Sequence, residues 1–215
     1  MYDRIGVEKG VALPIVSPEH MTDQLTVRAA RTAAETHPET IGWWFCNVDP
    51  RWLTNSPDAD LSIPMEYYKS RGAKGLGEFT TNLPVDDPMM QNLFFHAEKC
   101  GLPILFHIGQ QGGDYGIVDG LGLHKIEATL KKFPKLKLIG HSQKWWAEIS
   151  GDCSEQNRNG YPEGPVRPGG RPVELLRNYP NMYGDLSAGS GGNAIMRDPA
   201  FGYQFLEEFQ DKLFF

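Results

Sequence analysis

Short apolar runs alternate with amphipathic stretches along the whole chain. Apolar runs of about four to eight residues are typical of buried strands, and a helical spacing of apolar positions is typical of helices packed on a sheet. Strands that alternate with helices predict parallel strands joined by crossover helices. The pattern predicts strands at residues 10–15, 41–48, 73–79, 102–108, 136–141, 181–186 and 212–215, and helices at 18–36, 63–71, 87–100, 121–132, 172–178 and 199–210.

Helix boundaries carry their own signals. Asp87 before Pro88 predicts a capping carboxylate followed by proline in the first helical turn, and Asp198 before Pro199 repeats this pattern. Gly101 predicts the end of the helix that begins at Pro88.

Two glycine-rich segments interrupt the alternation, at residues 110–120 and 150–170. Each follows a predicted strand that ends in histidine, and the alternation resumes afterwards. Long loops in such positions are more often substrate lids than linkers between domains. With 215 residues and 40% hydrophobic residues, the chain suits a single domain over residues 1–215.

Charge and cysteine content exclude several partners. The net charge is −6 and no run of Lys or Arg forms a basic stripe, so nucleic acid is not expected. Three widely spaced cysteines indicate neither a disulfide framework nor a zinc knuckle, which favours a reducing, cytoplasmic setting. The N-terminus is charged where a signal peptide is apolar, and no apolar run reaches the ~18 residues of a membrane span.

Two histidines carry the most informative chemistry. His107 and His141 are each the first polar residue after a short apolar run, and a predicted helix separates the two runs. In an α/β barrel the carboxyl ends of successive strands converge on one rim, so both imidazoles can reach one metal ion or substrate. The alternative for each is a structural histidine hydrogen-bonded inside the core.

Two carboxylates, like the two histidines, lie at the carboxyl ends of predicted strands. Glu78 ends the predicted strand 73–79 and can bind a metal, orient a histidine or act as a base. Asp185 leaves the strand 181–186 and is a candidate catalytic residue. The alternatives are a solvated strand end for Glu78 and a helix cap for Asp185.

Other candidates are weaker. Lys74 and Trp145 are candidate substrate-binding residues, although a tryptophan beside a helix start is more often core packing. The remaining histidines, which are His20, His37, His96 and His124, have charged neighbours and are expected at the surface.

The succession of motifs resembles a known family. The motifs are Ala-Lys-Gly-Leu-Gly-Glu at 73–78, Leu-Pro-Ile-Leu-Phe-His-Ile-Gly at 102–109, Leu-Ile-Gly-His-Ser at 138–142 and Tyr-Pro-Asn-Met-Tyr-Gly-Asp-Leu-Ser-Ala at 179–188. Together they resemble the amidohydrolase-related branch of the metal-dependent hydrolase superfamily. The resemblance implies a (β/α)8 barrel with a divalent metal, usually zinc or manganese. It makes His107 a metal ligand and His141 a metal ligand or acid/base, and we add Glu78 as the third expected ligand.

The chain also departs from the family pattern. The family's first strand carries His-x-His just before the segment that matches Tyr2, and an aspartate ends its eighth strand just after the segment that matches Phe215. We therefore expect an α/β fold of the TIM type that lacks the first strand and the end of the eighth. Unpaired strand edges favour a homo-oligomer or a gapped barrel.

Three functions are compatible with these features. The leading hypothesis is a metal-dependent hydrolase of the amidohydrolase type, which acts on a small-molecule amide, ester or lactone with zinc as the expected metal and manganese as the second choice. A non-oxidative decarboxylase of an aromatic or dienoic acid is the alternative enzyme. A catalytically inactive binding protein with a histidine-lined pocket is the third hypothesis.

Overall fold

The computed structural model describes residues 4–15, 17–19, 25–113 and 115–215. Every predicted strand is present in these residues, although each is shorter than its apolar run. The strands are β1 (Gly10–Ala12), β2 (Ile41–Trp44), β3 (Leu76–Phe79), β4 (Ile104–His107), β5 (Leu138–His141), β6 (Met182–Asp185) and β7 (Leu213–Phe214).

The predicted helices are also present, with two additions. The helices are α1 (Val27–Thr36), α2 (Ser62–Lys69), α3 (Pro88–Cys100), α4 (His124–Lys132), α5 (Gln143–Ala147), α6 (Arg171–Asn178), α7 (Ala188–Met196) and α8 (Pro199–Phe209), followed by the 3-10 turn η2 (Gln210–Lys212). The helix predicted at 18–36 begins only at Val27 among the described residues. The apolar periodicity did not predict α5 or α7, although a helix start beside Trp145 and a helix after Asp185 were among the alternatives.

The predicted helix caps are confirmed. Asp87 accepts a hydrogen bond from the Met89 amide at 2.8 Å, and Asp198 accepts one from the Phe201 amide at 3.3 Å. Gly101 ends α3 in the left-handed conformation. These caps fix where α3 begins and ends and where α8 begins.

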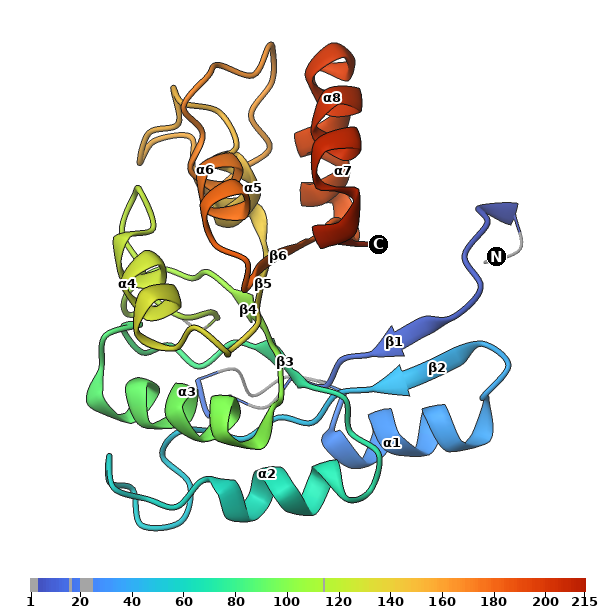
Figure 1. The fold of residues 1–215 in the computed structure, drawn as a ribbon, viewed down its shortest axis with the longest axis vertical. Coiled ribbons are helices and arrows are strands. Elements are labelled where there is room, and N and C mark those ends of the chain that lie inside the picture. Colours follow the sequence, from blue (N-terminus) through green and yellow to red (C-terminus); the bar gives the residue numbers. More distant parts are fainter. Residues whose placement is uncertain (1–3, 16, 20–24, 114) are drawn as a thin grey trace.

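All described strand pairs are parallel. Strands β3 to β7 pair in sequence order, and β1 pairs with β2 in a separate sheet. An isolated bridge between Cys46 and Leu76 connects the two sheets. In Figure 1 the helices follow the outside of this curved row of strands, and the β1–β2 pair lies at the β3 end of the row. Among the described residues β7 pairs only with β6 and β1 only with β2, so the row is gapped rather than closed.

The core between strands and helices explains two corrections. Trp145 is fully buried, and its indole meets Phe106 edge-on with ring centroids 5.8 Å apart. It has no surface left with which to contact a substrate, so its predicted substrate-binding role gives way to core packing. His96 is also buried, with 7% exposure, and lies on the inner face of α3. The prediction that it lies at the surface is wrong.

The missed helix α7 depends on close backbone contact. A Cβ atom at Gly191 would lie 2.3 Å from the carbonyl oxygen of Leu186, so the first turn of α7 packs directly on the end of β6. Glycine lowers helix propensity, which is why the segment resembles a turn when read as sequence. Tertiary packing overrides that preference here.

Both glycine-rich loops are tied to one another. Arg158 is buried and donates to the Glu148 carboxylate at 2.5 Å, to the Asp119 carbonyl at 2.9 Å and to the Gly120 carbonyl at 3.0 Å. The Glu148 carboxylate also accepts from the Gly122 amide. The two loops that were expected to be lids therefore share a buried ionic anchor. None of the described helices has the length and apolarity needed to cross a membrane.

Candidate metal and catalytic site

Four polar side chains meet at the carboxyl edge of the larger sheet. Glu78 comes from β3, His107 ends β4, His141 ends β5 and Asp185 ends β6. His107 and His141 are register partners, and their ring centroids lie 6.0 Å apart. Because carboxyl ends of parallel strands meet at one edge, the four residues converge although they are distant in sequence. The predicted gathering at this edge is confirmed.

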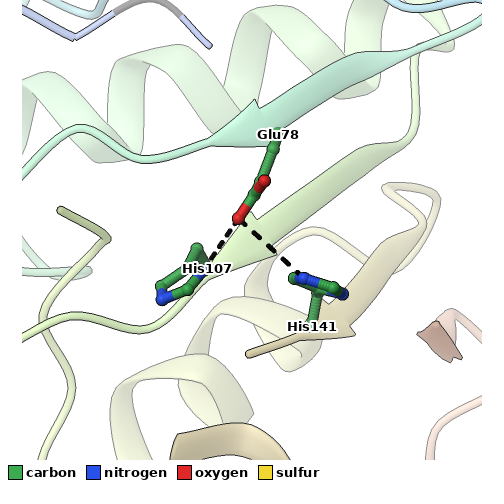
Figure 2. A group of neighbouring side chains, drawn as sticks. All are labelled: Glu78, His107 and His141. Carbon is green, nitrogen blue, oxygen red and sulfur yellow. Dashed lines mark hydrogen bonds and ion pairs between the residues drawn. The ribbon is translucent and has the colours of Figure 1, made fainter. Parts of the chain in front are cut away.

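One carboxylate oxygen of Glu78 links the two imidazoles. Its Oε1 lies 2.7 Å from Nδ1 of His107 and 4.0 Å from Nε2 of His141 (Figure 2). Gly77 makes this placement possible, because its φ is +146° and a Cβ atom there would lie 2.8 Å from the Leu105 carbonyl oxygen. Only glycine lets β3 approach β4 so closely just before Glu78.

His141 is fixed from its other side by Asp185. Its Nδ1 lies 2.8 Å from Oδ2 of Asp185, which also accepts a hydrogen bond from the Ser187 hydroxyl at 2.5 Å. An ionised carboxylate only accepts, so the proton of the imidazole resides on Nδ1 and Nε2 is directed toward Glu78. A carboxylate behind a histidine in this way fixes the ring orientation and raises its basicity.

Hydrogen bonds and neighbouring charges shift the pKa values of Glu78 and His141 in opposite directions. Burial alone would raise the pKa of Glu78, but the hydrogen bond with His107 and the charges of His141 and His107 outweigh it, and its pKa lies below the ordinary value. Burial alone would lower the pKa of His141, yet the Asp185 hydrogen bond and the Glu78 charge raise it. Both shifts favour the charged form of each group relative to its ordinary pKa.

The donor set fits a divalent metal. Glu78, His107 and His141 each offer one ligand atom, and these atoms lie within 4.8 Å of one another. Two imidazoles and one carboxylate are a ligand set of catalytic zinc sites, and imidazole with carboxylate also suits other divalent first-row metals. All three side chains are largely buried, with exposures between 12 and 16%. One ligand atom from each of the three side chains can therefore converge on a cation.

Sequence patterns missed Tyr115, which lies on the loop after β4. Its ring meets the His107 imidazole edge-on, with centroids 4.4 Å apart and an interplanar angle of 86°. Its hydroxyl hydrogen-bonds with Glu78. The glycine-rich sequence around Tyr115 predicts only a loop that follows the strand of His107, and nothing in it marks Tyr115 as part of the site.

The segment after β5 also holds the segment after β4. Ser142 follows His141 with φ at +104°, and its hydroxyl accepts from the Ile108 amide at 3.2 Å. The buried ammonium of Lys144 donates to the Gly109 carbonyl at 3.0 Å. Both contacts join backbone next to His107 with backbone next to His141. Their effect is to fix the two strand ends relative to one another.

The other predicted residues lie elsewhere. Lys74 is exposed before the start of β3, and Glu78 lies four residues further along, at about 3.3 Å per residue. The structure therefore does not bring Lys74 to the site. His37 and His124 are exposed as predicted, whereas His20 lies outside the described residues.

Comparisons with known proteins identify the fold. No protein-family model and no curated protein matches the sequence. An uncharacterised TIM-barrel protein from Bordetella bronchiseptica matches over 100% of this chain and 66% of its own, with 16% identity and a TM-score of 0.59. The fold is that of an incomplete TIM barrel.

Solved structures of named enzymes share this fold. A probable 2-pyrone-4,6-dicarboxylic acid hydrolase from Acinetobacter baumannii, with citric acid bound, matches 99% of this chain and 68% of its own at 11% identity, with a TM-score of 0.52. A 5-carboxyvanillate decarboxylase from Novosphingobium aromaticivorans, complexed with manganese and 4-hydroxy-3-methoxy-5-nitrobenzoic acid, matches 99% and 66% at 17% identity, also with a TM-score of 0.52.

These matches agree with the predicted fold class. The chain spans about two thirds of the length of each of these barrels, as expected for a TIM-type α/β barrel that is incomplete. The resemblance to amidohydrolase-related proteins is thus supported at the level of the fold. At these identities the similarity concerns the fold alone.

Proposed function

We propose that this chain carries the site of a metal-dependent hydrolase of the amidohydrolase type, which acts on a small-molecule amide, ester or lactone. The observation that carries the proposal is the convergence of Glu78, His107 and His141 at one sheet edge, with Asp185 bonded behind His141. A hydrolase of the same fold supports this choice.

Glu78, His107 and His141 have different roles in the proposed reaction. His107 and Glu78, whose ligand atoms are closest, would hold the metal, and His141 would act as the acid/base beside it. A divalent metal held there, which we propose is zinc or manganese, would polarise a carbonyl group and would lower the pKa of a bound water. During the reaction His141 accepts a proton at Nε2 and returns it to the leaving group, because Nδ1 remains bonded to Asp185.

A non-oxidative decarboxylase is the second candidate. The raised pKa of His141 favours an imidazolium, which can donate a proton to the carbon that loses carboxylate. The manganese complex of a decarboxylase with this fold supports the same metal class. An inactive binding protein is the third candidate, in which the site binds a small molecule without turnover.

Metal analysis followed by activity measurements tests these candidates. The purified protein is dialysed against zinc or manganese and its metal content measured, with His107→Ala as the variant and the exposed His37→Ala as the control. Stoichiometric metal in the wild type and control, and its loss in His107→Ala, is the expected result. Metal that washes out of the wild type under mild chelation contradicts an enzyme and favours the binding protein.

Substrate panels then separate the two enzymes. Aryl esters, lactones and amides are compared with hydroxylated aromatic acids. Metal-dependent hydrolysis that is lost in His141→Gln supports the hydrolase. Release of carbon dioxide from the acids without hydrolysis of the esters, lactones or amides contradicts it and supports the decarboxylase.

We also propose that the chain forms a homo-oligomer in the cytoplasm. Within the described residues the outer edges of β1 and β7 pair with no further strand, which supports self-association, because open strand edges recruit further strands. The free cysteines support a reducing compartment. Light scattering of the purified protein at several concentrations tests the oligomer, and a mass equal to one chain at every concentration contradicts it.

A further inference from the structure

The loop that leaves His107 returns directly over the site. Gly109 and Gly116 pack against one another, since a Cβ atom at Gly109 would lie 1.9 Å from the Tyr115 carbonyl oxygen. The Gly109 amide donates to the Ile117 carbonyl, and the Ile117 amide donates to the His107 carbonyl, both at 2.8 Å. This backbone contact fixes the path of the chain around Tyr115.

The same loop is attached to the segment that carries Glu78. The Gly116 amide donates to the Thr80 carbonyl at 2.7 Å, just after the end of β3. The Asn82 amide group donates to the carbonyls of Gln110 and Gly116, each at 2.9 Å. Backbone anchors on both sides therefore hold Tyr115 between the strand end of Glu78 and that of His107.

The Tyr115 side chain contacts both candidate ligands. Its ring edge packs on His107 at 4.4 Å between centroids, and its hydroxyl hydrogen-bonds with the Glu78 carboxylate. Ring packing alone would be served equally well by phenylalanine. The hydroxyl adds a partner to a carboxylate that already faces His107 and His141, so Tyr115 restricts how that carboxylate can rotate.

We propose that Tyr115 is a positioning residue of the metal site. Its hydroxyl fixes the Glu78 carboxylate, and its ring fixes the His107 imidazole, in the orientation that ligation requires. This inference rests on the proposed metal-dependent function. On this inference the glycine-rich loop at residues 110–120 orients the metal ligands and does not act as a mobile lid.

The test compares Tyr115→Phe with Tyr161→Phe, a matched change at an exposed tyrosine on the second loop. Calorimetric titration with Mn²⁺ and Zn²⁺ measures affinity, and the absorption spectrum of the Co²⁺-loaded protein reports ligand geometry. We expect Tyr115→Phe to bind metal ~10–100-fold more weakly, with a changed Co²⁺ spectrum. Tyr161→Phe is expected to match the wild type in both, and thermal unfolding of the metal-free proteins checks that both variants fold.

Two results overturn the inference in distinguishable ways. If the wild type binds metal and Tyr115→Phe binds it equally well with the same Co²⁺ spectrum, Tyr115 is not a positioning residue although the metal site stands. If the wild type binds no metal, the proposed function and the metal role of Tyr115 both fail. Nitrogen resonances of the His107 ring in the metal-free protein, unchanged by Tyr115→Phe, would independently exclude the positioning of that imidazole.

Discussion

Nδ1 of His141 lies 2.8 Å from Oδ2 of Asp185, on the side of the ring opposite the candidate metal site. Asp185 is nearly fully buried and receives a second hydrogen bond from the Ser187 hydroxyl at 2.5 Å. The carboxylate is therefore held in place on its own strand end before it orients the imidazole. His141 has one nitrogen committed to orientation and one available for chemistry.

Replacement of Asp185 by Asn tests this arrangement. The amide removes the negative charge and offers a donor where the imidazole needs an acceptor, so we expect metal affinity or activity to fall about 10–100-fold. Calorimetric titration with Zn²⁺ or Mn²⁺ measures the change. Asp58→Asn is the control, because it removes a carboxylate charge at an exposed position distant in sequence from the site. Equal losses in both variants would argue against a specific role for Asp185.

Gly140 precedes His141 and lies against the core. A Cβ atom there would lie 2.3 Å from the Trp145 indole, which is fully buried and cannot move freely. We expect Gly140→Ala to lower the free energy of unfolding by about 1–3 kcal/mol and to displace the end of β5. Gly192→Ala on α7 is the matched control, since nothing lies within 4 Å of its Cβ position. Urea unfolding measures both, and a Gly140→Ala variant as stable as the wild type contradicts the packing argument.

Arg158 and Glu148 form an ion pair in which both side chains are only 2% exposed. Removal of one partner leaves a buried charge without compensation, so Arg158→Met should lower the free energy of unfolding by about 3–5 kcal/mol. The exposed Arg167→Met, on the same loop, is expected to change it by less than about 0.5 kcal/mol. In the double variant Arg158→Met/Glu148→Gln part of the loss should be recovered. A double variant that loses the full sum of both single changes would show that the two side chains are not coupled.

Glu127 on α4 makes stability depend on acidity. The Tyr179 hydroxyl at 2.6 Å, together with Lys131 and Arg171, lowers its pKa from 4.5 to about 2. Because the folded pKa lies below the unfolded one, this stabilisation is present above pH 4.5 and is lost as the pH falls toward 2. Glu127→Gln should therefore be less stable at neutral pH but show a shallower loss of stability across that window.

Urea unfolding at a series of pH values measures this dependence. Glu207→Gln on the exposed face of α8 serves as the control, and its curve should run parallel to that of the wild type. Identical slopes for Glu127→Gln and the wild type below pH 4.5 would contradict the assigned coupling.

The sequence determined the succession of strands and all of the helices except α5 and α7, because hydrophobic periodicity and helix caps are local signals. Each predicted strand is present, and Asp87, Asp198 and Gly101 mark helix boundaries as expected. The two strand-end histidines and Glu78 followed from the same pattern, since the carboxyl ends of parallel strands share one edge. Features that depend on local sequence, which are strand and helix positions and strand-end residues, could therefore be predicted without the structure.

Only the tertiary structure decided which side chains meet and which are covered. Trp145 and His96 are buried by helices and strands distant in sequence, and no local pattern reports the space that remains around a side chain. Tyr115 reaches Glu78 because two glycines let the loop fold back on itself, 37 residues after the carboxylate it contacts (115 − 78). Contacts of this kind depend on backbone geometry and long-range packing, which the order of residues specifies only through the completed fold.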